Sequence, residues 1–242
     1  MTETHTTCAA YDQIAADYAA QAGRRDALAE SRRRFAARLA AGARVLDVGC
    51  GTGSVSRIIA DTRNAKIIGI EPDSHRAAAA CARGLEVYQE LFTPAIVQRL
   101  EPFNVILFAD VLEHVAHPGS FLQFARRALL PGGRVVASVP NVAHWSVRLD
   151  LLRGRFEYQP AGIRDSTHLR WFTADTVRSL FETNGLRVIS LQHTAGVGLP
   201  DYENRRPWRW IGRGRRDPLI RALARRLPLL FGCQHIIHAT PA

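Results

Sequence analysis

The sequence is poor in lysine and has no paired cysteines. Lys66 is its one lysine among 32 basic residues, so arginine supplies nearly all of the positive charge. The four cysteines, Cys8, Cys50, Cys81 and Cys233, are scattered and form no C-x-x-C pair. Such spacing argues against a disulfide framework or a zinc site and indicates the reduced thiols of a cytoplasmic protein. No clustered spacing of His, Asp and Glu requires a metal ion either.

Long apolar runs are absent as well. No stretch of about 18 apolar residues occurs, so we expect no transmembrane helix. The first residues, MTETHTTCAAYDQ, lack a basic segment followed by an apolar one, so we expect no signal peptide. With 242 residues, of which 47% are hydrophobic and 22% charged, the chain can bury the core of one α/β domain.

The formal net charge of +10 is unevenly distributed. Residues 1–23 carry a net charge of −3, residues 24–44 carry +5, residues 45–204 are balanced, and residues 205–242 carry +8. The excess therefore lies in an early helix-like stretch and in a C-terminal segment. An arginine-rich and alanine-rich composition also follows from GC-rich coding, so the bulk charge supports a nucleic-acid partner only weakly.

Short apolar runs and helix-like stretches alternate along the chain, which predicts a parallel, doubly wound sheet. The last apolar run is expected to pair antiparallel with the run before it, at the edge of the sheet. The expected strands are 43–49, 66–71, 85–90, 102–110, 134–140, 186–194 and 233–241. The expected helices among them are 54–62, 73–84, 118–130 and 173–185. The sequence thus predicts an α/β fold, a Rossmann-like doubly wound sheet of seven strands with an antiparallel last strand.

We expect a single domain over residues 1–242, because no repeat or long linker divides the chain. Residues 140–172 interrupt the alternation of strands and helices and are interpreted as an insert on the substrate side. The expected parts are an N-terminal helical cap at 1–42, a cofactor-binding half at 43–140, the insert at 141–172, and a C-terminal half at 173–242 with a basic segment at 205–231.

The stretch LDVGCGTGS follows the first expected strand and precedes a helix. Its glycines, Gly49, Gly51 and Gly53, permit unusual backbone dihedrals and a close approach of N–H groups to a ligand. The spacing G-x-G-x-G differs from the dinucleotide pattern G-x-G-x-x-G, and Asp47 would lie unfavourably near a pyrophosphate. A carboxylate at this place favours a cationic ligand instead. Glu71, at the end of the second strand, is placed to accept hydrogen bonds from ribose hydroxyls.

These motifs resemble those of a known family. VLDVGCGTGSVSRIIA resembles the first motif of class I S-adenosylmethionine-dependent methyltransferases, and IIGIEPD resembles the second. The stretch from Phe103 to Asn141 is similar to the region of strands four and five in that superfamily, and the likeness extends over residues 11–193. GIRDSTHLRWFT further resembles a bacterial subgroup that modifies sugars, lipids or secondary metabolites.

The resemblance implies S-adenosylmethionine as the cofactor and assigns roles to single residues. Gly49, Gly51 and Gly53 would line its methionine and ribose parts, and Asp47 would reach the methionine ammonium. The remaining implied contacts are Glu71 with the ribose diol, Asp110 near the sulfonium, and Tyr11 and Tyr18 in a helix that closes over the cofactor. Glu90 is the acid nearest in sequence to the position after strand three that meets the adenine in the family, and backbone groups are the alternative there.

The insert carries the candidate groups for binding and activating the acceptor. Methyl transfer to a hydroxyl benefits from a general base, and histidine is the natural choice near neutral pH. His168 and His144 are the candidates for this catalytic role, with a structural histidine as the alternative for each. Glu113 and His114 have either a local structural role or a contact with substrate. Other possible site groups of the insert are Asn141, Trp145, Asp165, Arg170 and Trp171.

The basic segment contains a helical pattern at 217–227, where Leu219, Ile220, Leu223 and Leu227 form an apolar stripe among arginines. One interpretation is an ordinary helix that packs on the sheet and has a solvated arginine face. Another is a peripheral contact with an anionic membrane or a lipid-linked substrate. RNA is a third and weaker interpretation, because no RNA-binding motif is present.

The predicted function is transfer of a methyl group from S-adenosylmethionine to a small-molecule acceptor, first of all a hydroxyl of a saccharide or secondary metabolite. Alternatives are an N-methyltransferase and a methyltransferase that acts on a lipid-linked substrate, RNA or protein. From other classes, a NAD-binding oxidoreductase and a cofactor-binding protein without activity stay open. We expect a cytoplasmic enzyme, and the sequence leaves its oligomeric state open.

Overall fold

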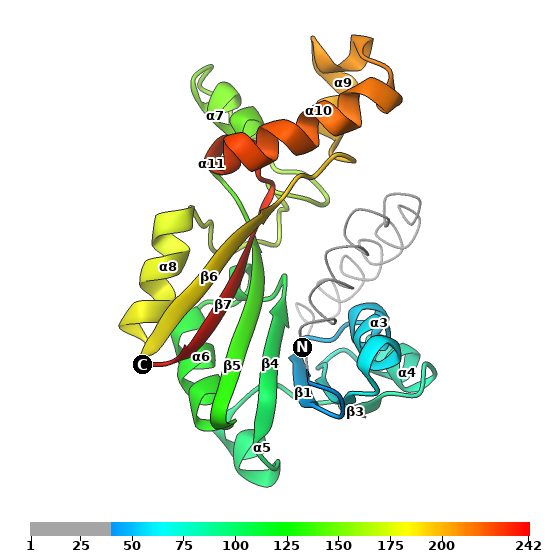
Figure 1. The fold of residues 1–242 in the computed structure, drawn as a ribbon, viewed down its shortest axis with the longest axis vertical. Coiled ribbons are helices and arrows are strands. Elements are labelled where there is room, and N and C mark those ends of the chain that lie inside the picture. The colour runs from blue at the N-terminus through cyan, green and yellow to red at the C-terminus, as the bar shows by residue number, and fades with distance from the viewer. Residues whose placement is uncertain (1–39) are drawn as a thin grey trace, which may run out of the picture.

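A computed structural model describes residues 40–242 of the chain. Tyr11, Tyr18 and the expected N-terminal helices lie outside the described residues. The described part is a sheet flanked by helices (Figure 1). Its strands are β1 (Arg44–Val48), β2 (Lys66–Ile70), β3 (Glu86–Tyr88), β4 (Phe103–Ala109), β5 (Leu129–Pro140), β6 (Leu186–Thr194) and β7 (Gln234–Pro241).

Helices connect most of these strands. No helix within residues 40–242 is both long and apolar enough to cross a membrane. The α-helices are α3 (Ser54–Arg63), α4 (Ser74–Cys81), α5 (Pro94–Arg99), α6 (Pro118–Arg127), α7 (Trp145–Leu151), α8 (Ala174–Thr183), α9 (Pro200–Asn204), α10 (Arg213–Arg226) and α11 (Pro228–Phe231). Two short 3-10 turns are η2 (Leu112–His114) and η3 (Trp208–Trp210).

The sheet has seven strands in the order β3-β2-β1-β4-β5-β7-β6. Strands β1 to β5 pair in parallel, and β7 pairs antiparallel with both β5 and β6. The predicted Rossmann-like sheet with an antiparallel last strand is confirmed. Because β7 runs against its neighbours, its first residue, Gln234, lies where the parallel strands end, paired with Pro140 and Thr194.

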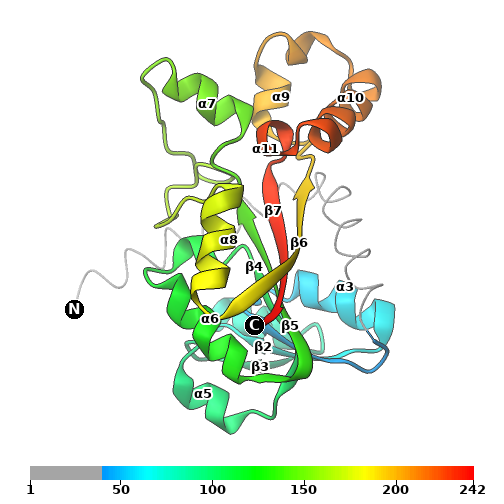
Figure 2. The same cartoon turned by 60° about the vertical axis from the view of Figure 1, so that its left-hand side comes forward.

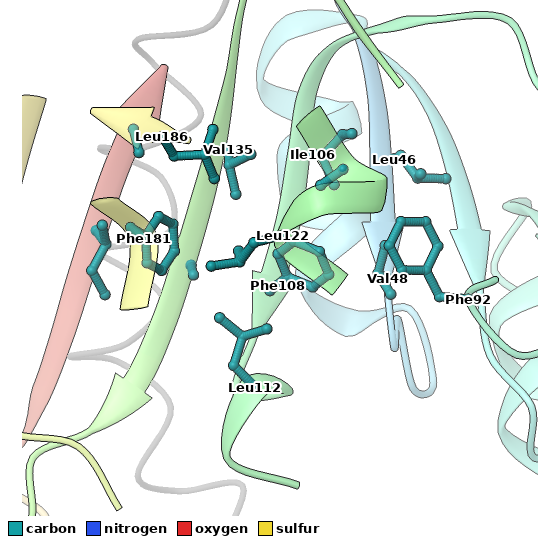
Figure 3. Packing of buried hydrophobic residues seen from close by; sticks show 14 of the residues in the cluster. Leu46, Val48, Phe92, Ile106, Phe108, Leu112, Leu122, Val135, Phe181 and Leu186 are labelled. Atoms are coloured by element: carbon teal, nitrogen blue, oxygen red, sulfur yellow. The ribbon is translucent and has the colours of Figure 1, made fainter. Parts of the chain in front are cut away.

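The hydrophobic core covers both faces of the sheet, because neighbouring residues of a strand point to opposite faces. Leu46 of β1 enters the cluster that holds Phe108 of β4 and Phe181 of α8 (Figure 3). Val45, the preceding residue, enters a second cluster with Ile59 of α3. Helices α5, α6 and α8 therefore cover one face, and α3 and α4 pack on the other (Figure 1).

The boundary between α6 and β5 differs from the expected one. The helix ends at Arg127 rather than at residue 130, and the strand begins at Leu129 rather than at Arg134. Leu129 pairs with Phe103 of β4, and the register then shifts before the regular ladder resumes. The turn-like residues at 131–133 therefore form an irregularity inside the strand, where two strands stay paired around a local bulge.

Helices α7, α9, α10 and α11, with η3, lie together at one end of the molecule and are called the end lobe here (Figures 1 and 2). A buried ion network holds the lobe together. Asp150 of α7 accepts hydrogen bonds from Arg164 at 2.7 Å and from Nη1 of Arg205 at 2.7 Å. Arg205 also pairs with Asp201 of α9 at 2.9 Å. These contacts fasten the insert to the segment that follows β6.

The expected helix in the basic segment is present, and it begins earlier, at Arg213. The predicted apolar stripe is divided, because the residues that α10 buries are Arg216, Ile220 and Ala224, whereas Leu219 is exposed. Their spacing of four places them on one face of the helix. Burial of an arginine on that face is possible because its guanidinium donates a hydrogen bond to the carbonyl of Tyr202 at 2.8 Å.

Candidate active site

The glycine loop leaves β1 and enters α3 at the carboxyl edge of the sheet. The N–H of Gly49 donates to the carbonyl of Ile70 at 2.8 Å, and the N–H of Gly51 donates to Oε2 of Glu71 at 2.9 Å. Gly49, Gly51 and Gly53 have φ values of 69°, 54° and 74°, which lie in the left-handed region that favours glycine. The predicted loop between a parallel strand and a helix N-terminus is thus present, and β2 holds it in place.

The three glycines are needed for different reasons. A Cβ on Gly49 would meet Cγ2 of Val111 at 2.7 Å, and a Cβ on Gly53 would collide with Leu85. A Cβ on Gly51 would have no atom within 4 Å. The outer two glycines therefore permit close packing, whereas the central one borders open space that a ligand can enter.

Asp47 and Glu71 place two buried carboxylates beside this loop. Asp47 is 1% exposed, and its Oδ2 accepts a hydrogen bond from the hydroxyl of Ser56 in α3. Glu71 is 5% exposed, and besides Gly51 it accepts a hydrogen bond from the N–H of Asp73 at 3.0 Å. Two negative side chains next to an open glycine make the site favourable for a cationic ligand that offers hydrogen-bond donors.

Asp110 follows β4 with φ 57°, a left-handed conformation for a residue that is not glycine. Its Oδ1 accepts hydrogen bonds from Oγ of Ser138 at 2.8 Å and from Nε2 of Gln234 at 2.8 Å, and Gln234 also reaches Oδ2 at 3.0 Å. Ser138 and Gln234 were not identified from the sequence. Gln234 is 124 residues away from Asp110 and approaches it only because β7 runs antiparallel.

Glu90, predicted to lie near the adenine, is exposed in the structure. It lies two residues after β3 and pairs with Arg99 of α5 at 2.5 Å. Its role in binding adenine stays a prediction. The same holds for Tyr11 and Tyr18, which lie outside residues 40–242.

His144 lies in the interior of the end lobe. It is 0% exposed, and its ring nitrogens contact Oγ of Ser146 at 2.9 Å and the hydroxyl of Tyr202 at 3.1 Å. Burial lowers the pKa of His144 to about 3, with a smaller contribution from the nearby Arg205. His144 is also the N-cap of α7, where its side chain accepts from the N–H of Ser146. A base with both nitrogens occupied is poorly placed to accept a proton from an acceptor.

His168 lies in a second buried group, together with Glu113 and His114. Both carboxyl oxygens of Glu113 and Nδ1 of His168 are buried and have no hydrogen-bond partner. The ring of His168 lies edge-on to that of His114, 4.8 Å between centroids. Burial raises the pKa of Glu113 well above its usual range and, together with the positive potential of His114, lowers the pKa of His168 to about 4. With a pKa of about 4, His168 is uncharged near neutral pH.

Within the described residues, Glu113, His114 and His168 are also a group that offers three potential metal ligands. Their ligand atoms lie within 4.8 Å of one another. Ligands about 2.1 Å from a tetrahedral zinc ion are only about 3.4 Å apart, and metal binding requires an ionised carboxylate. Burial of Glu113, which raises the pKa of its carboxyl well above the usual range, opposes metal binding by this group. The sequence spacing could not reveal it, because His168 is 54 residues from His114.

Comparison with known proteins agrees with the fold and the glycine loop. A sequence family described as "Methyltransferase domain" matches residues 20–191, which is more than half of the chain. The chain belongs to the class I S-adenosylmethionine-dependent methyltransferases. The methyltransferase is therefore an enzyme whose cofactor is S-adenosylmethionine, as the glycine loop and its two carboxylates indicate.

Curated relatives of the methyltransferase include ubiquinone biosynthesis O-methyltransferases. The enzyme of Nitrobacter winogradskyi is 34% identical over 155 residues, which cover 61% of the chain and 58% of that relative. The mitochondrial enzyme of Homo sapiens is 30% identical over 159 residues, which cover 61% of the chain and 42% of that relative. The chain spans less than two thirds of the length of these relatives.

Solved structures share the fold at low sequence identity. A SAM-dependent methyltransferase from Archaeoglobus fulgidus has a TM-score of 0.62 and 16% identity, with 89% of the chain and 93% of that protein covered. A putative methyltransferase from Haloferax volcanii, solved with the Trm112 activator, has a TM-score of 0.62 and 19% identity, with 96% and 95% covered. At such identities the likeness establishes the fold alone.

The residues around the loop fit the cofactor. The open space at Gly51 allows a ligand to approach the backbone, and a Cβ at that position would occupy part of it. Glu71 already orders the loop through Gly51 and keeps unused lone pairs, since a carboxylate can accept about four hydrogen bonds. Glu71 would therefore hold the ribose hydroxyls, and the negative charge of Asp47 and Asp110 would favour the cationic methionine part.

Proposed function

We propose that the methyltransferase transfers a methyl group to a hydroxyl of a small molecule. The observation that carries this proposal is the similarity to O-methyltransferases, at 34% identity to the Nitrobacter enzyme and 30% to the human one. A saccharide or secondary metabolite stays our first acceptor class. A nitrogen acceptor is the alternative within the same chemistry. The predicted cytoplasmic location and single-domain organisation remain predictions.

The bound cofactor supplies an electrophilic methyl group on a positively charged sulfur. The contribution of the chain is to bind, to orient and to exclude water, which are the main terms in methyl transfer. Glu71 and the glycine loop would fix the nucleoside end. Asp110, held by Ser138 and Gln234, would present a carboxylate in a fixed direction beside the reacting group.

Calorimetric titration with S-adenosylhomocysteine tests the cofactor part of this proposal. Glu71→Gln replaces a charged acceptor by an amide, so we expect the Kd to rise about tenfold or more, as is typical of a hydrogen bond to a charged group. Glu182→Gln, the same change on the exposed face of α8, is the matched control and should leave the Kd unchanged. Equal Kd values for the two variants would contradict the assigned role of Glu71.

Acceptor chemistry is tested by transfer of a radioactive methyl group from labelled cofactor to a panel of sugars, phenols and amines. The proposal requires that the best acceptor carries the new methyl group on oxygen, as determined by NMR of the product. A product methylated only on nitrogen would refute the proposed transfer to oxygen and support the N-methyltransferase alternative.

A lipid-linked acceptor is a second candidate, because the end lobe exposes large apolar side chains. Leu152 is 85% exposed, Trp210 is 65% exposed and Leu229 is 52% exposed. Arg206 and Arg209 lie over the ring of Trp210, at 4.9 Å and 5.8 Å from its centroid. Exposed leucine and tryptophan side chains among arginines favour an anionic membrane surface over RNA, for which charge without apolar groups suffices.

Sedimentation with vesicles of phosphatidylglycerol or of phosphatidylcholine tests this candidate. We expect binding to the anionic vesicles and its loss in the pair of changes Leu152→Ser and Trp210→Ser. Leu91→Ser is the matched control, since Leu91 is 66% exposed and follows β3, outside the end lobe. No binding to either vesicle, or binding that RNA abolishes, would exclude a membrane contact of the end lobe.

A further inference from the structure

Gln234, which contacts Asp110, lies at the very end of the sheet. It is the first residue of β7 and forms the last pair of two ladders, opposite Pro140 of β5 and Thr194 of β6. The ends of secondary-structure elements open more easily than their middles, because fewer contacts hold them. The position of the Gln234 amide therefore depends on what holds the chain just before β7.

Asn141 holds this part of the chain. It directly follows β5 and is 0% exposed. Its backbone N–H donates to the carbonyl of Cys233 at 2.9 Å, and its Nδ2 donates to the carbonyls of Gly232 at 2.8 Å and Leu229 at 3.2 Å. Its Oδ1 accepts a hydrogen bond from the N–H of Ala143 at 2.9 Å. One side chain thus ties the insert to the turn that joins α11 to β7 (Figure 2).

Only an amide side chain can make these contacts. The carbonyls of Gly232 and Leu229 require a donor, whereas the N–H of Ala143 requires an acceptor. Asparagine carries two N–H donors and one carbonyl acceptor, and an ionised aspartate has acceptors alone. A buried carbonyl that loses its donor costs free energy, so an apolar residue of the same size would loosen this turn.

Asp110 lies next to the cofactor loop. Val48 of β1 pairs with Phe108 of β4, so the glycine loop and Asp110 follow two paired strands at the same edge of the sheet. Val111 packs so closely on Gly49 that a Cβ on that glycine would meet it at 2.7 Å. The carboxylate of Asp110 thus belongs to the turn that packs on the loop.

The contacts of Asp110 fix the direction of its carboxylate. Nε2 of Gln234 lies 2.8 Å from Oδ1 and 3.0 Å from Oδ2, so one amide group bridges both oxygens. Oγ of Ser138 donates to Oδ1 at 2.8 Å. The backbone of Asp110 has φ 57°, and a left-handed residue other than glycine persists only where its surroundings hold it. Movement of Gln234 would therefore release the carboxylate.

We propose that Asn141 is a positioning residue of the cofactor site and acts through Gln234 on Asp110. Asn141 holds the start of β7, and Gln234 then keeps the carboxylate of Asp110 directed at the positive sulfur of the cofactor. The inference rests on the proposed function, in which Asp110 lies beside the reacting group. A charge that is already oriented stabilises a cation better than one that must first reorient.

The proposal gives Asn141 a role different from the one considered for it in the sequence, a possible site group of the insert. Asn141 is fully buried, and its side-chain amide contacts the protein backbone on both sides. The same contacts connect the cofactor site with the end lobe, because Leu229 belongs to α11. A shift of α11 is thereby passed to Asp110 through Asn141 and Gln234.

The change Asn141→Leu tests the proposal, because it keeps the approximate size and adds no charge. Calorimetry gives the Kd of S-adenosylmethionine and of S-adenosylhomocysteine, which differ in the charge on sulfur. We expect the ratio of the two Kd values to shift toward the neutral form by about threefold to tenfold, as is typical of a weakened hydrogen bond to a charged group.

Asn184→Leu is the matched control. Nδ2 of Asn184 also donates to a backbone carbonyl, that of Leu180, at 2.7 Å. Asn184 precedes β6, at the edge of the sheet where the parallel strands begin, so its loss should lower stability and leave the Kd ratio as in the wild type.

A double variant shows whether Asn141 acts through Gln234. If it does, Asn141→Leu combined with Gln234→Leu should shift the Kd ratio no further than Gln234→Leu alone. A merely structural Asn141 would instead weaken the binding of both cofactor forms equally and leave their ratio unchanged.

The contact can also be measured without cofactor. NMR should show slow solvent exchange for the side-chain N–H of Gln234, whose signal is assigned by its loss in Gln234→Leu. Asn141→Ser, which keeps one hydroxyl donor, should accelerate this exchange, and Asn184→Ser should not. Asn141→Ser should also shift the Kd ratio in the same direction as Asn141→Leu, so it decides the test if Asn141→Leu does not fold.

Three results would overturn the proposal. One is a Kd ratio in the folded Asn141 variants that equals that of the wild type. Another is a double variant whose shift is the sum of the two single shifts, beyond the error of about twofold that independent sites show. The third is unchanged exchange of the Gln234 amide in Asn141→Ser. If the wild-type enzyme methylates only nitrogen acceptors, the proposed function fails instead, and the exchange of the Gln234 amide still reports on Asn141.

Discussion

Mild acid should destabilise the methyltransferase through its buried histidines, and His144 allows the effect to be measured. The pKa of His144 falls from 6.5 to about 3 on folding, because burial disfavours the charged ring. Below pH 6.5 the His144 ring therefore binds a proton in the unfolded chain, whereas in the folded chain it stays neutral until the pH approaches 3. Because the folded-state pKa of His144 is depressed, its contribution to the free energy of unfolding is fully present above the unfolded-state pKa of 6.5. This contribution is lost as the pH falls toward the folded-state pKa of about 3.

The magnitude follows from the two pKa values. Between about pH 7.5 and 5.5 the unfolded histidine goes from mostly neutral to mostly charged while the folded one stays neutral. The free energy of unfolding should fall by about 1.4 kcal/mol over this interval because of His144 alone. Glu113 acts in the opposite direction, since its folded-state pKa is raised. The comparison of variants, rather than the total pH dependence, isolates the contribution of His144.

Urea unfolding at both pH values measures this contribution. The change His144→Asn keeps an acceptor for the N-terminus of α7 and removes the titrating ring. We expect the decrease in unfolding free energy between the two pH values to become smaller by about 1.4 kcal/mol in this variant. His75→Asn changes an exposed histidine of α4 and should leave the decrease as in the wild type. A decrease of the same size in His144→Asn and in the wild type would refute the reasoning.

Further perturbations address the loop, Asp110 and the ion network. Gly49→Ala forces a left-handed residue against a valine and should lower stability by about 2 kcal/mol in urea unfolding and weaken cofactor binding. Gln234→Leu removes two hydrogen bonds from Asp110, so calorimetry should show the preference for the sulfonium cofactor over its neutral thioether product decrease about tenfold. Asp150→Asn leaves a buried arginine without its main partner and should cost about 3 kcal/mol, whereas Asp61→Asn in an exposed pair of α3 should cost less than about 0.5 kcal/mol. An equal loss of stability in the last two variants would contradict the buried network.

Local sequence patterns were sufficient to predict most of the fold. Continuous apolar runs predicted the parallel strands, because strands buried on both faces need apolar side chains at every position. The expected helices were present, with ends that differed by a few residues where tertiary pairing extended β5 toward α6. The apolar stripe of the basic segment was predicted less well. Sequence spacing could not show that Arg216 would be buried and Leu219 exposed, since the burial of Arg216 depends on a carbonyl of α9.

The cofactor site could be predicted from the sequence because its residues are close together along the chain. Gly49, Gly51, Asp47 and Glu71 lie within one strand, one turn and the end of the next strand, so their geometry follows from local backbone structure. The contacts among residues beyond the loop could not be predicted in this way, because they join distant parts of the chain. His114 meets Thr167 across 53 residues, and Asp110 meets Gln234 across 124.

The sequence by itself determined the fold class, the glycine loop and the kind of cofactor. Each of these depends on backbone conformation and on charges near one another in the chain. Only the tertiary structure decided that the two histidines predicted to be catalytic are enclosed. Long-range contacts buried His144 and His168. Burial and hydrogen bonding set the tautomer and the pKa of a histidine, and both depend on neighbours that the order of residues does not disclose.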